Sequence, residues 1–170
     1  MSLSSERSKA LRQRRQEQGL CVRCGRTNPS AVWCCSFCKA RRNSWMSKQR
    51  EKGFCTLCGT NLAKIGKFCE RCKDGRENYD QDIKRSAMEH YGQGKCACCK
   101  NDFLPHLTLD HVNNDGKAHR ASLRGWERGG ICLYKKLKRE GYPNNPPLQV
   151  LCFNCNMAKK YYGVCPCQVK

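Results

Sequence analysis

The sequence predicts a series of small α+β modules, each built around four cysteine side chains, instead of one large domain. The chain has 170 residues, 17 of them cysteine, and few large aliphatic residues. Units this small bury little apolar surface and need cross-links. Twelve of the cysteines form six Cys-x-x-Cys pairs. The pairs are Cys21/Cys24, Cys35/Cys38, Cys55/Cys58, Cys69/Cys72, Cys96/Cys99 and Cys152/Cys155.

The cysteine pairs suit zinc better than disulfides. Two residues between the thiols allow a tight turn that aims both sulfurs at one tetrahedral ion. Residues 1–18 contain no apolar signal segment, and an odd number of cysteines fits a secreted disulfide framework poorly. We therefore expect an intracellular chain without a membrane segment that binds about three structural zinc ions, each held by two pairs.

The first two zinc modules repeat each other. Ten residues separate Cys24 from Cys35, and ten separate Cys58 from Cys69. Two copies in register are much stronger evidence than one pair. The stretches after the second pairs, residues 39–52 and 73–91, are rich in charged helix formers and lack proline, which predicts two helices. Each module is therefore treble-clef-like, with a knuckle, a short hairpin and a helix that carries the second pair at its start.

These patterns divide the chain into four parts. We predict a basic helix within residues 1–20, a first four-cysteine zinc module at residues 21–53 and a second at residues 54–94 with a trailing helix. The final domain is expected at residues 95–170.

The net charge is strongly positive. It is +19 with histidines neutral, and twelve thiolates (−12) with three zinc ions (+6) leave +13. Residues 1–53 carry 13 Lys and Arg against 3 acidic residues. This concentration suits a polyphosphate partner, although the modules could also be structural staples without a partner. The expected phosphate contacts are Arg12, Arg14, Arg15, Arg41 and Arg42.

The third set of thiols is spaced differently, because 52 residues separate Cys99 from Cys152. Apolar Leu107 and Leu109 alternate with polar residues, which predicts a strand within residues 103–111 that ends in Asp110 and His111. A turn is expected at residues 113–116, a second strand at 148–151 and a helix at 156–162. The expected shape is two strands and a helix around one metal-binding groove.

Three segments of this part resemble the HNH, or His-Me finger (ββα-metal), endonucleases, and most closely their zinc-bound phage forms, such as the phage recombination endonucleases. The segments are Cys96-x-x-Cys99, Leu-Asp-His-Val-Asn-Asn-Asp-Gly at 109–116, and Leu-Gln-Val-Leu-Cys-x-x-Cys-Asn-x-x-Lys at 148–159. The match covers about residues 95–167. It implies an HNH domain with one structural zinc held by four cysteines, in bacterial or phage-infected cytoplasm. The middle Asn of the motif is either Asn145 or absent.

The resemblance implies a metal-dependent DNA endonuclease whose products carry a 3′-hydroxyl and a 5′-phosphate. His111 would be the general base, because a neutral imidazole accepts a proton near physiological pH. Asp110 and Asn156 would hold Mg²⁺ or another hard divalent ion, which prefers oxygen ligands. Further candidates for phosphate binding are His119, Arg120, Asn113 and Lys159, although His119 could equally be a surface histidine.

Two other functions stay open. One is a zinc-module binder of DNA or RNA whose HNH unit is inert, and the other is an adapter that binds protein. The set of Asp110, His111 and Asn156 argues against the first, and the basic charge argues against the second. Double-stranded DNA is the expected partner, and charge alone does not exclude RNA.

Two further features are the insertion between the two predicted strands and five cysteines that lie outside the Cys-x-x-Cys pairs. Part of residues 121–142 is predicted to form a basic amphipathic helix, which Tyr142-Pro143 stops and whose apolar face packs on the HNH unit. Cys34 and Cys98 adjoin ligand cysteines and could replace them. A metal or redox contact of Cys165 and Cys167 with Cys98 is possible, but simple burial is the expectation. The unpaired cysteines are Cys34, Cys98, Cys132, Cys165 and Cys167.

Overall fold

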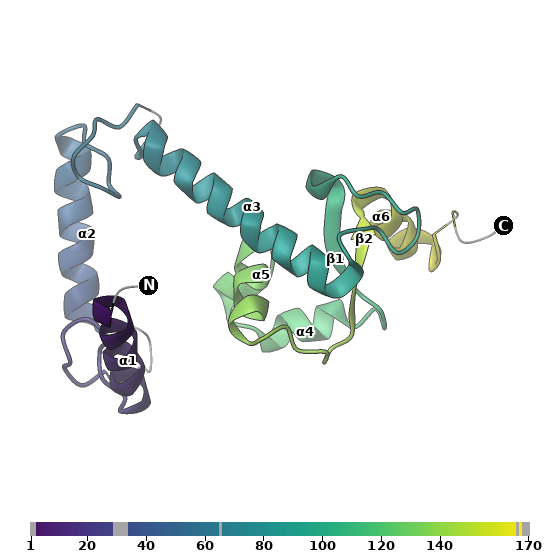
Figure 1. Cartoon of the computed structure of the whole chain (residues 1–170), viewed down its shortest axis with the longest axis horizontal. Coiled ribbons are helices and arrows are strands. Elements are labelled where there is room, and N and C mark those ends of the chain that lie inside the picture. The colour runs from purple at the N-terminus through teal and green to yellow at the C-terminus, as the bar shows by residue number, and fades with distance from the viewer. Residues whose placement is uncertain (1–2, 29–33, 65, 166, 168–170) are drawn as a thin grey trace. The chain divides into compact units, whose positions relative to one another are not determined.

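The computed structural model describes residues 3–28, 34–64, 66–165 and 167. The chain divides into two compact units, Met1–Asp74 and Gly75–Lys170, and the division falls within the long helix α3 (Glu70–Gly92) (Figure 1). The predicted small α+β architecture is confirmed, with one two-stranded sheet among the described residues. In these ranges no helix is both long and apolar enough to cross a membrane.

The first unit contains helices α1 (Leu3–Glu17), α2 (Ser36–Glu51) and the start of α3. Isolated antiparallel bridges join Leu20 to Thr27 and Phe54 to Leu62, so each module has the short hairpin that its sequence predicts. Helices α2 and α3 begin directly after Cys35 and Cys69, about three residues before the predicted starts. The second cysteine pair of each module therefore lies at the start of its helix, as expected.

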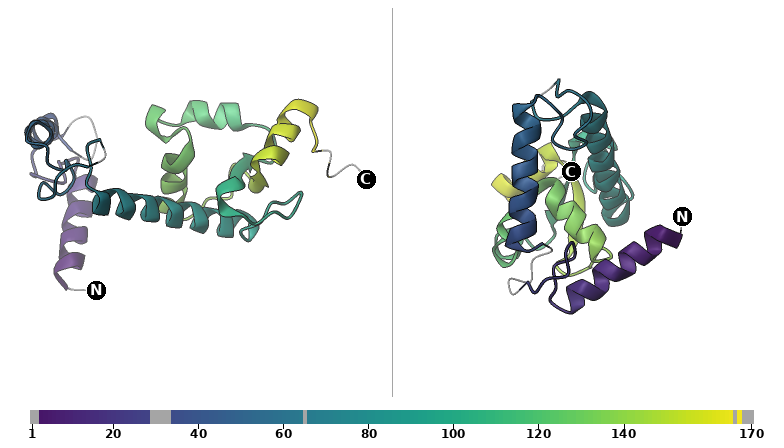
Figure 2. Two further views of the ribbon diagram at one scale, coloured as in Figure 1. Left: turned by 90° about the horizontal axis from the view of Figure 1, so that it is seen from above. Right: turned by 90° about the vertical axis from the view of Figure 1, so that its left-hand side faces the viewer.

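The second unit is built around strands β1 (Leu107–His111) and β2 (Leu148–Cys152) and helix α6 (Phe153–Tyr162). The strands are antiparallel, with Leu107 opposite Cys152 and Asp110 opposite Gln149. Helix α6 follows β2 directly and contacts both strands (Figure 1, Figure 2). Strand β1 confirms the short strand that the sequence predicts within residues 103–111, and the residues before it form the 3-10 turn η1 (Leu104–His106).

Helix α3 supplies one side of the core of the second unit. Met88, Leu107 and Val150 are fully buried in one cluster. A Cβ atom at Gly92 would lie only 2.6 Å from Val150 Cβ, so the end of α3 approaches β2 more closely than any larger residue would allow. This packing makes α3 more than the trailing helix of the second zinc module.

The insertion between the strands folds into helix α4 (Gly116–Ser122), the 3-10 turn η2 (Gly125–Glu127) and helix α5 (Gly130–Arg139). Helix α5 confirms the predicted amphipathic helix, and its buried Leu133 and Leu137 pack with Leu123. It ends at Arg139, three residues before the predicted stop. Helix α4 was not expected from the sequence.

Candidate metal centres and polar site

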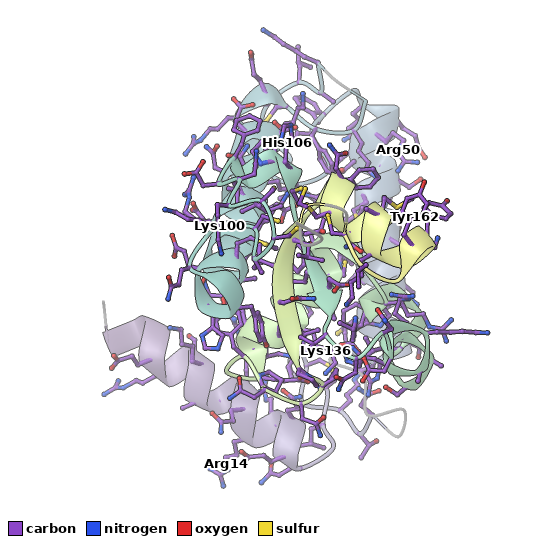
Figure 3. The ribbon with its side chains drawn as sticks, turned by 90° about the vertical axis from the view of Figure 1, so that its right-hand side faces the viewer. Arg14, Arg50, Lys100, His106, Lys136 and Tyr162 are labelled. Carbon is purple, nitrogen blue, oxygen red and sulfur yellow. The ribbon has the colours of Figure 1, made fainter. Side chains whose placement is uncertain are left out.

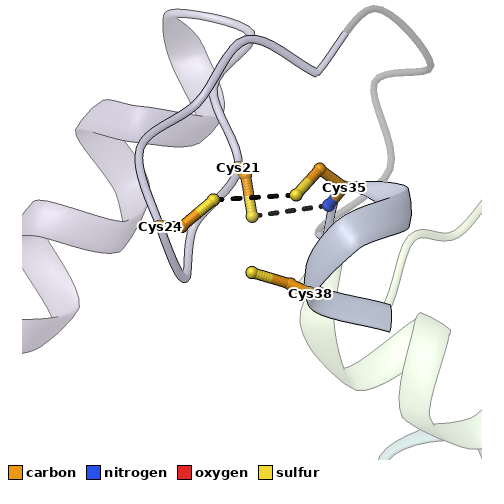
Figure 4. A group of neighbouring side chains, drawn as sticks. All are labelled: Cys21, Cys24, Cys35 and Cys38. Atoms are coloured by element: carbon orange, nitrogen blue, oxygen red, sulfur yellow. Dashed lines mark hydrogen bonds between the residues drawn. The ribbon is translucent and has the colours of Figure 1, made fainter. Parts of the chain in front are cut away.

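The first candidate metal centre lies where a hairpin meets the start of α2 (Figure 4). Its four sulfur atoms lie within 4.8 Å of one another, and Cys24 Sγ is 3.6 Å from Cys35 Sγ. Sulfurs that surround zinc tetrahedrally at ~2.3 Å stand about 3.8 Å apart, so this spacing suits one zinc ion. The first group consists of Cys21, Cys24, Cys35 and Cys38.

Backbone amides favour the thiolate form in the first group. The N–H of Cys35 donates to Cys21 Sγ over 3.4 Å. This hydrogen bond and one from the amide of Cys24 lower the pKa of Cys21 to about 5. Because the deprotonated sulfur is the metal ligand, these amides prepare the site for a cation.

The second group repeats the first, as the sequence repeat predicts. Cys58 Sγ lies 3.8 Å from Cys69 Sγ, and the amide of Leu57 donates to Cys55 Sγ over 3.4 Å. The side chain of Thr60 and nearby amides lower the pKa of Cys58 to about 5. The second group consists of Cys55, Cys58, Cys69 and Cys72, again within 4.8 Å of one another.

The third group ties the loop after α3 to the end of β2 and the start of helix α6. Cys152 ends β2, its sulfur lies 3.6 Å from Cys99 Sγ, and it accepts a 3.4 Å hydrogen bond from the amide of Cys155 in the first turn of α6. Burial acts to raise the pKa of Cys96, but amides of Cys152 and Cys99 outweigh it and lower that pKa to about 7. The third group consists of Cys96, Cys99, Cys152 and Cys155.

A fourth group of thiols corrects the expectation for the end of the chain. Simple burial is wrong for Cys167, which is exposed. Cys155 belongs to both the third and the fourth group, and four groups, not three, could hold metal ions. Among the described residues, Cys34 and Cys132 belong to none of them. The fourth group consists of Cys98, Cys155, Cys165 and Cys167, within 4.8 Å of one another.

Asp110 is held by two donors on the side of β1 that faces helix α6. Lys159 Nζ lies 2.6 Å from Asp110 Oδ2, and Gln149 Nε2 donates to the same oxygen over 2.8 Å. The ammonium also donates to the carbonyl of His111 over 2.7 Å. The side chains of Lys159 and Asp110 are only 14% and 13% exposed. A cation therefore already lies against the predicted metal-binding carboxylate.

Asn156 lies along the same side of β1, one turn of α6 before Lys159. Its Nδ2 donates to Thr108 Oγ1 over 3.0 Å. Thr108 in turn donates to the carbonyl of Leu151 over 3.0 Å. Thr108 and Asp110 share one face of the strand because side chains alternate along it. The structure thus places Asn156 and Asp110 on one β1–α6 surface, which we call the polar site.

His111 follows Asp110 and is directed to the other face of β1, toward α4. His111 Nε2 lies 2.7 Å from His119 Nδ1. A Cβ atom at Gly116 would lie 2.9 Å from His111 Nδ1, so α4 packs directly on the ring. Burial, and second the charge of His119, lower the pKa of His111. Burial also lowers the pKa of His119, followed by the charge of Lys136.

The histidine pair has a carboxylate nearby that the sequence did not single out. Asp115 Oδ1 is buried and has no hydrogen-bond partner within the described part of the chain. Its negative charge acts to raise the pKa of both His111 and His119, against the larger effect of burial. Asn113 and Arg120 are exposed, and the charge of Arg120 acts to lower the pKa of both His111 and His119.

No protein-family model matches the chain, and neither the curated proteins nor the solved structures contain a match.

Three features of the polar site were missed in the sequence, namely Thr108, Gln149 and the ion-pairing role of Lys159. Gln149 is opposite Asp110 in the strand register, and Thr108 precedes Asp110 by two residues. Period-two alternation and the register would have identified the first two. The Lys159 contact depends on how α6 is rotated against β1, which no sequence pattern specifies.

Proposed function

We propose that the second unit is a metal-dependent DNA endonuclease of the HNH type, with β1, β2 and α6 as its ββα-metal motif. The observation that carries the proposal is the polar site, where an amide and a carboxylate from two elements share one surface. Asn156 bonds to Thr108, two residues from Asp110 on the same strand face. The nearby His111 supplies an imidazole for proton transfer.

The donor types of the polar site fit a hard divalent ion. Both hydrogen bonds to Asp110 go to Oδ2, which leaves Oδ1 for a metal, and Asn156 uses Nδ2 for its bond to Thr108, which leaves its carbonyl oxygen. Asp110 and Asn156 would hold Mg²⁺. When bound, the ion would neutralise charge that grows on the phosphate and the leaving oxygen.

His111 is the proposed general base. Its lowered pKa keeps the imidazole neutral at physiological pH, so the ring can accept a proton from the attacking water. His119 lies within hydrogen-bond distance and can hold one proton between the two rings. We assign His119 the role of orienting His111. We assign the exposed Arg120 and Asn113 the role of contacting phosphate.

The zinc modules are proposed to bind the DNA backbone, with zinc in the first three cysteine groups. Arg12, Arg14, Arg41 and Arg42 are exposed, and Arg14 projects from α1 in Figure 3. Arg15 is used differently, because its guanidinium donates to the carbonyl of Val22 over 3.2 Å. It therefore fixes α1 to the first module, and we do not count it among the phosphate contacts.

The ion pair of Lys159 with Asp110 favours a second candidate function. If the ammonium permanently takes the place of a metal at Asp110, the unit is an inert HNH fold within a nucleic-acid-binding protein. In the endonuclease, the lysine must instead share the carboxylate with the metal or move toward the phosphate. The two functions predict opposite results for nicking.

A plasmid-nicking assay tests the proposal. Zinc-loaded protein is incubated with supercoiled plasmid and Mg²⁺, together with the variants His111→Ala, Asp110→Asn and Asn156→Ala. We expect the wild type to nick and His111→Ala to be slower by roughly 10²-fold or more, the usual contribution of a general base. His106→Ala is the matched control, because His106 is exposed in the same unit, outside the polar site.

The competing role of Lys159 is tested in the same assay. For Lys159→Met we expect half-maximal nicking at a lower Mg²⁺ concentration, because the ammonium no longer competes for Asp110. Equal nicking by wild type and His111→Ala would remove the catalytic assignment. If neither wild type nor Lys159→Met nicks while both still shift duplex DNA in a gel, the second candidate function is correct.

A further inference from the structure

Apart from Cys132, the thiols of the second unit form one continuous cluster. Cys155 Sγ lies within 4.8 Å of Cys152 and Cys99 in the third group and of Cys98 and Cys165 in the fourth. All members of each group lie within 4.8 Å of one another. Cys155 is itself buried in the first turn of α6. It thus lies at the junction of two four-sulfur sites.

We propose that these two sites hold two zinc ions bridged by the Cys155 thiolate, as a binuclear cluster of seven cysteines. Each ion keeps the four sulfur ligands that zinc prefers, because a thiolate sulfur has enough lone pairs to bind two ions. All seven thiols lose their protons when the cluster forms. Seven thiolates and two divalent ions leave three negative charges, one fewer than two separate four-thiolate sites.

Packing alone does not explain why Cys165 and Cys167 lie near Cys98. After α6 the chain reverses at Gly163, which has φ of 78°, and Cys165 is then buried next to Cys98. Val164, which lies between Gly163 and Cys165, is 52% exposed, and Cys167 is also exposed. An apolar contact would bury Val164. The atoms that lie close together in this segment are the cysteine sulfurs, as a metal site requires.

The first module provides a natural comparison. Cys34 adjoins the ligand Cys35 as Cys98 adjoins Cys99, and it also packs against its own cysteine group. Within the described ranges, however, it has no second set of thiols around it. Cys34 is therefore a matched control for an extra cysteine beside a zinc site.

Counting the zinc ions tests the proposal. The full-length protein is purified with zinc under reducing conditions and weighed by native mass spectrometry. We expect four zinc ions per chain in the wild type and in Cys34→Ser, and three in Cys165→Ser and in Cys167→Ser. Cys167 is exposed, so its substitution disturbs packing least. Three ions in all four proteins, or four in all four proteins, would overturn the proposal.

Cadmium distinguishes a bridge from two separate sites. With ¹¹³Cd in place of zinc, two ions that share a thiolate show scalar coupling to each other through the sulfur. We expect one coupled pair of ¹¹³Cd signals in the wild type and none in Cys165→Ser. Four uncoupled signals would overturn the bridge. A different result would be a wild-type chain with three zinc ions and a mass two hydrogens below that expected for reduced thiols. It would show a disulfide in the fourth group and also overturn the proposal.

Discussion

His111 and His119 form a closely coupled pair of ionisable groups. Their facing nitrogens are 2.7 Å apart, and His111 is 7% exposed. Two imidazolium rings at this distance would repel each other, so the pair takes up its protons in separate steps. Burial lowers the pKa of both rings, and the neutral form is the native one at physiological pH.

We predict that both histidines titrate below the usual imidazole pKa of ~6.5. Because their folded pKa values are lowered, the pair stabilises the fold above that pH and loses this effect as the pH falls through the lower values. His119→Gln should move the pKa of His111 upward, since one positive neighbour is removed. The measurement is an NMR titration of the ring signals in zinc-loaded protein. A His111 midpoint at or above ~6.5 in the wild type would contradict the prediction.

At this scale, residue types and spacing predict the main side chains of the candidate site. They point to Asp110, His111 and Asn156, and the structure brings Asp110 and Asn156 to the polar site. Their partners were not predictable, because hydrogen bonds such as that of Lys159 to Asp110 join residues 49 apart. The ion pair depends on side-chain direction, which a motif leaves open.

Among the elements, α3 shows how one helix can serve two units. Its first turn carries Cys72 of the second group, and its last turns carry Met88 and Gly92 against β2. The charged composition of residues 73–91 predicted the helix itself. It did not predict the buried stripe that packs on the strands, because the buried residues Ile83, Ala87 and Met88 are few among many polar ones.

We predict that Gly92→Ala destabilises the second unit by about 1–3 kcal/mol, the usual cost of overpacking a core. The added methyl group would meet Val150 at 2.6 Å. Gly75→Ala is the matched control in the same helix, since nothing lies within 4 Å of its added Cβ and alanine favours a helix by up to ~1 kcal/mol. Urea unfolding measures both. Equal stability of the two variants would show that α3 and β2 separate easily.

For the whole molecule, the buried apolar side chains show what holds the fold together. In the first unit every one of them, over the described residues, is a cysteine, namely Cys21, Cys35, Cys38, Cys55 and Cys69. The second unit adds a small core that includes Met88, Leu107 and Val150. Without a cation, the first unit has almost no hydrophobic contribution to set against the entropy of the chain.

We predict that metal removal unfolds the first unit completely and leaves part of the second. Structural zinc contributes on the order of 10 kcal/mol of apparent binding energy per site in small zinc peptides, more than either core can replace. A chelator is added under reducing conditions, and amide dispersion is followed by NMR. Signals of residues 3–64 should collapse first and return with zinc. Unchanged dispersion in metal-free protein would contradict this prediction.

The sequence by itself determined the cysteine modules, the helices that follow them, and Asp110 and Asn156 as candidate site residues. Those features depend on short-range spacing, which sets turns and faces directly. Only the tertiary structure decided that Lys159 lies on Asp110, that His119 pairs with His111 and that Cys155 joins two groups of thiols. Each of these contacts depends on how a helix or a turn packs against an element that is distant in the sequence. Packing of the whole unit sets that geometry, and no local pattern encodes it.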